Sequence, residues 1–195
     1  MNGQSELLGA VARVVRVFEA LDIEYFVGGS VASSVFGEPR QTIDADLVAR
    51  VLGRHVSALT EQLASEFYID AGAISSAIAN QGSFNLIHLS TMTKVDIFVN
   101  WRTPFATSQF ARRKKRRLVP TDPTELFFAS PEDTVLAKLE WYRRGGSVSD
   151  RQWRDLVSVL KVQNQALDRA YLKDWAERLE LTALLDRALS DAGLA

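Results

Sequence analysis

The stretch GGSVASSVFGEPRQTIDADLV, which runs from Gly28 to Val48, begins with two glycines and a serine and ends with two aspartates in an apolar frame. Glycine lets the backbone turn sharply and approach a ligand closely, because it has no Cβ. A helix that begins near Ser30 would direct its free N–H groups at an anion. Residues two apart on a strand share a face, so Asp44 and Asp46 together favour a cation. Because 13 residues separate Ser30 from Asp44, we expect one ligand that carries both charges, such as a metal-bound nucleotide.

The composition limits the classes of protein that the chain can belong to. With 195 residues, it suits one domain with a small appended lobe, and 47% hydrophobic and 24% charged residues are ordinary for a globular protein. A formal net charge of -1 excludes a chain that binds nucleic acid by its overall charge. The absence of cysteine excludes disulfides and thiolate metal sites, and two histidines argue against a multi-histidine zinc site.

The N-terminal sequence MNGQSELLGAVARVV has no basic start before an apolar run, which argues against a secretory signal. No apolar stretch approaches the roughly 20 residues that a membrane-spanning helix needs. We therefore expect a cytoplasmic protein that has no membrane partner.

The first two-thirds of the chain alternate between helical and strand patterns. Apolar residues at helical spacing predict an amphipathic helix over residues 5–21, and EYFVGG predicts a short strand that enters a glycine turn. A short helix with Ser30 as its N-cap should follow and stop near Gly37. RHVSALTEQLASEF predicts a second amphipathic helix. FNLIHLS and TKVDIFVNW predict two strands, paired as a hairpin across STMT.

The last third of the chain is helical throughout. In SPEDTVLAKLEWYRR, Ser130 is a good N-cap, Pro131 suits the first helical position, and two acids fall in the first turn. Three further helical patterns follow. The predicted fold is α/β (α+β): a mixed sheet flanked by helices in a core of residues 1–125, and an all-helical subdomain of residues 126–195.

Three aspartates are the candidate catalytic and metal-binding residues. TIDADLVARV alternates, with Ile43, Ala45 and Leu47 on one face and Asp44, Asp46 and Val48 on the other; these aspartates could also be an exposed polar face of an edge strand.

Asp96 interrupts the strand KVDIFV, where an aspartate opposes the β-propensity of its neighbours. Alone, it could be a charge at a strand edge. If its strand lies beside residues 43–48, three carboxylates converge. Hard oxygen ligands of this kind favour Mg²⁺ or Mn²⁺.

The glycine-rich segment is by itself equally typical of an ordinary strand-to-helix turn.

Taken together, VGGS, DAD and VDIF resemble the nucleotidyltransferase superfamily of the DNA polymerase β type. RQTIDADL, PEDTVLAKLEW and SDRQWRDL resemble its AbiEii-like subgroup, which includes minimal toxin-like members. The resemblance covers roughly residues 23 to 160. It implies a nucleotidyltransferase-like fold, nucleotide binding, such as ATP binding, and transfer of a nucleoside monophosphate. It also implies a role as the toxin of a toxin–antitoxin or phage-defence system.

The resemblance also implies a role for each site residue. Gly29 and Ser30 would hold the triphosphate. Asp44 and Asp46 would bind two metal ions, and Asp96 would share the second ion and help to deprotonate the attacking hydroxyl.

Three further residues have two interpretations each. Lys138 of AKLEW would contact phosphates or be a solvated helix lysine. Arg40 would meet a phosphate or pair with a neighbouring acid, and Asp155 would orient Lys138 or lie on a wet helix face.

The run RRKKRR, residues 112–117, is a candidate binding surface for a partner. A run of charge is usually a solvated or disordered segment. A local basic patch can also bind the phosphates of a nucleic-acid acceptor such as tRNA, or an acidic partner such as an antitoxin. The aromatic residues of the helical third fall at core spacings and predict packing: Trp141, Tyr142, Trp153 and Trp175.

Three functions follow from these patterns. The first is a Mg²⁺- or Mn²⁺-dependent nucleotidyltransferase that acts on a hydroxyl of RNA or protein. The second is a catalytically inactive nucleotide- or partner-binding module of the same fold, against which the intact three carboxylates argue. The third is a metal-dependent phosphohydrolase or nuclease, which the Gly-Gly-Ser turn disfavours.

Overall fold

The structure, a computed structural model, describes residues 3–99, 101–117 and 125–194. The chain divides into two compact units. The first, here called the sheet unit, spans Met1–Gly28 and Gln41–Phe128, and the second, the helical unit, spans Gly29–Arg40 and Ala129–Ala195. These units differ from the predicted division at residue 125, because residues 29–40 group with the C-terminal helices. The division into functional domains stays a prediction.

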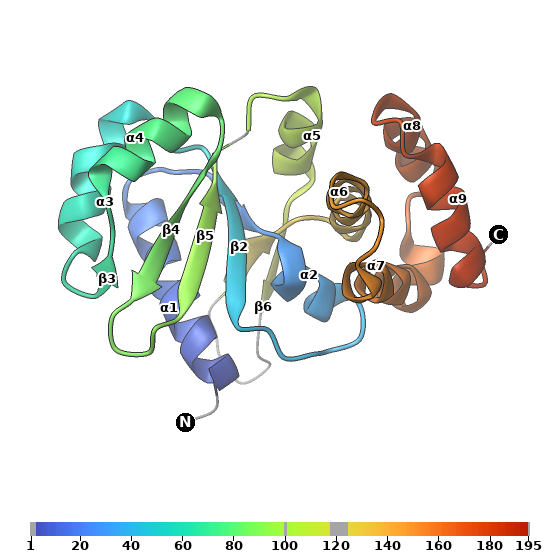
Figure 1. Cartoon of the computed structure of the whole chain (residues 1–195), viewed down its shortest axis with the longest axis horizontal. Helices are drawn as coiled ribbons and strands as arrows, with labels where there is room; N and C mark the ends of the chain where they lie inside the picture. The colour runs from blue at the N-terminus through green and yellow to red at the C-terminus, as the bar shows by residue number, and fades with distance from the viewer. Residues whose placement is uncertain (1–2, 100, 118–124, 195) are drawn as a thin grey trace. The chain divides into compact units, whose positions relative to one another are not determined.

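The sheet unit contains a mixed sheet of seven strands among the described residues, in the order β3-β4-β5-β2-β1-β7-β6. Figure 1 shows β4, β5 and β2 side by side in this sheet. The predicted mixed sheet and the hairpin of β4 and β5 are confirmed. The strands are β1 (Tyr25–Val27), β2 (Asp44–Ala49), β3 (Phe67–Tyr68), β4 (Ser83–His88), β5 (Lys94–Phe98), β6 (Lys114–Arg117) and β7 (Glu125–Phe128).

Strands β2 and β5 run parallel, with Asp46 directly opposite Asp96. The alternation along β2 follows the predicted period of two, because Ala45 and Leu47 are buried while Asp44 and Asp46 are partly exposed. The same pattern buries the apolar neighbours of Asp96 on β5. All three aspartates therefore stand on one face of the sheet.

Helix α1 (Gly3–Ala20) covers the other face, where it packs on β2 and β5 (Figure 1). Phe18 of this helix contacts Tyr25, whereas the next residue along β1, Phe26, packs edge-on against Phe110 of α5 (Pro104–Arg112). Because adjacent strand residues point to opposite faces, α5 lies on the face that carries the aspartates. The remaining helices of this unit are η1 (Gly53–His55), α3 (Val56–Leu63) and α4 (Ala71–Asn80).

The helical unit joins α2 to the helices of the last third of the chain. Ser130 caps α6 as predicted, because its hydroxyl accepts a hydrogen bond from the backbone N–H of Asp133. The elements of this unit are α2 (Gly29–Phe36), α6 (Pro131–Arg144), α7 (Asp150–Gln163), η2 (Asn164–Ala166), α8 (Arg169–Arg178) and α9 (Thr182–Asp191). Among the described residues, no helix is long and apolar enough to cross a membrane.

Three sequence-based expectations about single residues are wrong. Ile43 is 84% exposed and precedes β2, so it does not belong to the buried face of that strand. Ser30 is the second residue of α2 and not its N-cap. Trp141 is 49% exposed, whereas Tyr142 and Trp175 are buried as predicted.

Candidate functional site

The aspartates of β2 are held by contacts at the start of the strand. The hydroxyl of Thr42, which is buried, lies 3.2 Å from a carboxylate oxygen of Asp44 and 3.1 Å from the backbone oxygen of the same residue. The backbone oxygen of Asp46 accepts a hydrogen bond from the N–H of Gly28 at 2.8 Å. These contacts hold the first residues of β2, whose two carboxylates leave the sheet on the face opposite α1.

The third carboxylate is paired with a lysine of its own strand. Lys94 Nζ lies 2.8 Å from Asp96 Oδ2, and Lys94 itself stands opposite Asp44 in the register of β2 and β5. The pKa of Lys94 is raised, first by its hydrogen bond to Asp96. The charges of the three aspartates on this face raise it further, against an opposing effect of burial. The group is therefore an ammonium ion that faces three carboxylates.

Carboxylate oxygens are the donors that Mg²⁺ and Mn²⁺ prefer, so the chemistry of this set fits a divalent ion. In the part of the chain that the structure describes, no three His, Cys, Asp or Glu side chains are arranged to hold one metal ion. In this arrangement Asp96 is paired with Lys94 through Oδ2.

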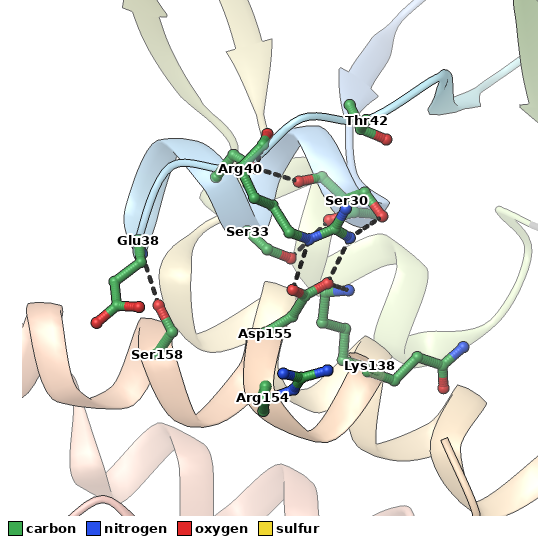
Figure 2. A network of polar contacts seen from close by, with 12 residues as sticks. Ser30, Ser33, Glu38, Arg40, Thr42, Lys138, Arg154, Asp155 and Ser158 are labelled. Carbon is green, nitrogen blue, oxygen red and sulfur yellow. Dashed lines mark hydrogen bonds and ion pairs between the residues drawn. The ribbon is translucent and has the colours of Figure 1, made fainter. Parts of the chain in front are cut away.

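In the helical unit, a second cluster gathers around one carboxylate (Figure 2). Arg40 holds both oxygens of Asp155, with Nε at 2.7 Å from Oδ1 and Nη2 at 2.7 Å from Oδ2. Nη2 of the same guanidinium also donates to the Ser30 hydroxyl at 2.8 Å. Lys138 of α6 donates to Asp155 Oδ2 at 2.9 Å. Two cations thus share one carboxylate, and the three charged groups carry a net charge of +1.

Burial and charge oppose each other at Asp155. Its side chain and that of Lys138 are only 8% and 9% exposed. Burial alone would raise the pKa of Asp155, but the hydrogen bonds and charges of Arg40 and Lys138 outweigh it, so this pKa lies below its ordinary value. Lys138 is therefore not a solvated helix lysine, Arg40 does pair with an acid, and Asp155 does not lie on a wet helix face.

The glycine turn has the backbone geometry that its sequence suggests. Gly29 has φ of +53°, in the left-handed region that residues with a Cβ rarely adopt. It opens α2, and its carbonyl accepts a hydrogen bond from the Ser33 hydroxyl at 2.8 Å. The first turn of a helix has N–H groups without partners inside the helix, which makes it suited to an anion.

Two parts of the basic run of residues 112–117, Arg113 and residues 114–117, differ in their surroundings, and Arg112 ends α5. Arg113 pairs with Glu24 at 2.8 Å and lies over the rings of Phe110 and Phe127, so it belongs to the packing of the sheet unit. Residues 114–117 form the strand β6, which ends the order of described strands and is exposed along its whole length. This part of the run is an ordered, solvated strand.

Two polar residues beside the three aspartates were given no role in the sequence analysis. Thr42 and Lys94 each lie two residues before a candidate aspartate, at Asp44 and Asp96 respectively. Because strand residues two apart share a face, the spacing alone could have shown Lys94 to be a neighbour of the carboxylate.

The fold resembles that of nucleotidyltransferase-like proteins. An antigenic nucleotidyltransferase-like protein from Paracoccidioides brasiliensis matches with a TM-score of 0.56 and 21% identity, over 96% of this chain and 94% of that one. The antibiotic-resistance factor ANT(2'')-Ia matches with a TM-score of 0.57 and 10% identity, over 97% of this chain and 95% of that one. At such identities the likeness is one of fold. The sequence matches no protein-family model and no curated protein.

Proposed function

We propose that this protein is a Mg²⁺- or Mn²⁺-dependent nucleotidyltransferase, which transfers a nucleoside monophosphate from a nucleoside triphosphate to a hydroxyl group. The observation that carries the proposal is the register of β2 and β5, in which Asp46 stands opposite Asp96 and Asp44 stands on the same face. The fold supports the same class of reaction.

The sheet unit supplies the acidic part of the chemistry. Asp44 and Asp46 would hold the divalent metal ions, with Thr42 fixing the orientation of Asp44. A bound divalent ion would favour the alkoxide form of the acceptor hydroxyl and offset the charge of the leaving pyrophosphate. Asp96, once released from Lys94, would share the second ion and take the hydroxyl proton. The acceptor oxygen then bonds to the α-phosphorus, the bond from that phosphorus to the β-phosphate oxygen breaks, and pyrophosphate leaves.

The helical unit supplies the groups that bind phosphate. Lys138 and Arg40 are cations kept in place by Asp155, so that little side-chain entropy is lost when a phosphate arrives. Ser30 adds a hydroxyl, and Gly29 brings backbone without a Cβ to the start of α2. Asp155 acts through the two cations as a positioning residue.

The acceptor that we propose is RNA, with tRNA as the first candidate. The four cations of β6, residues 114–117, are exposed and regularly spaced along one strand, which suits the phosphates of a nucleic-acid backbone. An antitoxin that covers this strand, membership of the AbiEii-like subgroup, a toxin role and a cytoplasmic location remain predictions from the sequence.

Label transfer tests the reaction. The protein is incubated with each of the four NTPs labelled at the α-phosphate, with Mg²⁺ or Mn²⁺, and with total RNA, protein or hydroxyl-bearing antibiotics. We expect label in RNA from the parent and none from Asp46→Asn. Nucleotide binding without transfer to any acceptor would make the protein a binding module. Degradation of the acceptor would make it a nuclease or phosphohydrolase.

The proposed RNA surface has its own test. Lys114→Gln with Arg116→Gln should weaken tRNA binding and reduce its salt dependence by about two charges, because each phosphate contact contributes a slope near one. ATP binding should not change. Lys161→Gln with Lys173→Gln, a pair of exposed lysines in the helical unit, is the control. If both double variants bind tRNA equally well, β6 is not the RNA surface. Loss of binding to an acidic protein alone would favour the antitoxin.

A further inference from the structure

Lys94 is the one cation, among the described residues of β2 and β5, on the face that carries the three aspartates. In the paired register, Asp44 and Asp46 of β2 face Lys94 and Asp96 of β5, so the four side chains occupy neighbouring positions on two strands. Three carboxylates and one ammonium carry a net charge of -2.

The two partners of this ion pair differ in exposure. The side chain of Asp96 is 19% exposed and that of Lys94 is 46% exposed. The carboxylate is thus fixed on the strand, whereas a lysine has a flexible four-carbon stem that can carry its ammonium into water. Three clustered carboxylates repel one another unless a cation lies among them. Lys94 supplies that cation from within the chain.

We propose that Lys94 is a resident counter-ion of the carboxylate cluster, which a divalent cation must displace from Asp96 before Asp96 can serve as a ligand. This inference rests on the proposed function, since it requires a metal site at these aspartates. An ammonium ion and a divalent ion that compete for the same carboxylate oxygen repel each other. Lys94 therefore lowers the affinity for the metal while it keeps the metal-free cluster from repelling itself.

The test is the affinity for Mn²⁺ in the absence of nucleotide. Titration calorimetry and the electron paramagnetic resonance signal of free Mn²⁺ both measure it. Lys94→Met keeps the length of the side chain and removes its charge. We expect Mn²⁺ to bind this variant about tenfold more tightly than the parent, equal to about 1.4 kcal/mol. Lys173→Met, which removes an exposed lysine of the helical unit, should bind Mn²⁺ as the parent does.

A double-mutant cycle shows whether Lys94 acts through Asp96. In an Asp96→Asn background, Lys94→Met should gain much less affinity than in the parent, because the shared oxygen is no longer charged. An equal gain in both backgrounds would overturn the proposal, and so would unchanged or weaker Mn²⁺ binding by Lys94→Met.

The failure of this inference differs from that of the proposed function. If Mn²⁺ binds and Asp44→Asn abolishes binding, but Lys94→Met has no effect, the metal site stands and the role of Lys94 falls. If neither the parent nor Lys94→Met binds Mn²⁺ at these aspartates, both proposals fall.

Discussion

Asp155 is the residue whose environment has the clearest energetic consequence. Its carboxylate is buried and accepts hydrogen bonds from Arg40 and Lys138, two cations that are brought to it from different parts of the helical unit. Removing one partner of a buried ion pair leaves the other charge without compensation, which costs far more than the loss of a surface pair.

Asp155→Asn should lower the free energy of unfolding by about 3–5 kcal/mol at pH 7. The folded-state pKa of Asp155 lies below its ordinary value of 3.8, so its carboxylate contributes stability above that pH. This contribution is lost as the pH falls through the folded-state pKa, and the difference between parent and variant should therefore shrink below about pH 4.

Urea unfolding at pH 7, 5 and 3 measures this difference. Asp150→Asn, an exposed carboxylate at the start of the same helix, is the matched control and should change stability little. A difference for Asp155→Asn that stays constant from pH 7 to pH 3 would show that the charge of this residue is not what stabilises the fold.

Gly28 and Gly29 are adjacent, but only Gly29 has a positive φ. Gly29→Ala should cost about 1–2 kcal/mol of folding free energy, because alanine is strained at a φ of +53°. A Cβ at Gly28 would meet only the backbone oxygen of Asp46, at 4.0 Å, so Gly28→Ala should cost less. Equal urea midpoints for the two variants would contradict the left-handed conformation at Gly29.

At the scale of elements, hydrogen bonds join the C-terminal end of α2 to α7. Ser158 accepts a hydrogen bond from the backbone N–H of Glu38 at 2.5 Å, and the side chain of Gln163 donates to the backbone oxygen of Phe36 at 2.7 Å. Gly37, between these two contacts, permits the close approach. Arg40, which pairs with Asp155 of α7, follows this junction in the chain.

Gly37→Ala should destabilise the protein by about 1–3 kcal/mol, since overpacking forces backbone to move. The new Cβ would lie 2.5 Å from Ser158 Oγ and 3.0 Å from the backbone oxygen of Ser33. Gly53→Ala, where a Cβ meets nothing within 4 Å, is the control. Thermal unfolding of the two variants compares them, and a Gly37→Ala variant as stable as Gly53→Ala would refute the close packing of α2 on α7.

The elements themselves were largely predictable, because their signals are local. The period of two in TIDADLVARV predicted β2, and Ser130 with Pro131 predicted the start of α6. The contacts between these elements were harder to predict from the sequence. Arg40 and Asp155 lie 115 positions apart, and no local sequence pattern predicts which acidic residue an arginine pairs with. Ile43 was misplaced because the alternation in the sequence begins one residue before the strand does.

At the scale of the whole molecule, the sequence predicted a mixed sheet followed by helices, and the structure confirms it. It did not show that residues 29–40 leave the sheet unit to join the helical unit, since this depends on packing between segments distant in sequence. The carboxylates proposed to bind metal lie in the sheet unit, and the cations proposed to bind phosphate, Arg40 and Lys138, lie in the helical unit. The central claim is that Asp44 and Asp46 bind the metal that accompanies the nucleotide.

The melting temperature with and without Mg²⁺ and NTP tests that claim most directly. A ligand at 100 times its Kd adds about 2.7 kcal/mol of stability, which for this size of chain raises the melting temperature by about 5–10 °C. The parent should show this rise, Asp44→Asn and Asp46→Asn should lose most of it, and Asp96→Asn should keep much of it while losing transfer. Without ligand, Asp44→Asn and Asp46→Asn should melt at or slightly above the parent, because one repelling charge is gone. Asp96→Asn also loses its ion pair with Lys94, so it should melt at or slightly below the parent. A parent that does not respond to Mg²⁺ and NTP, or an Asp44→Asn variant that responds as the parent does, would contradict the claim.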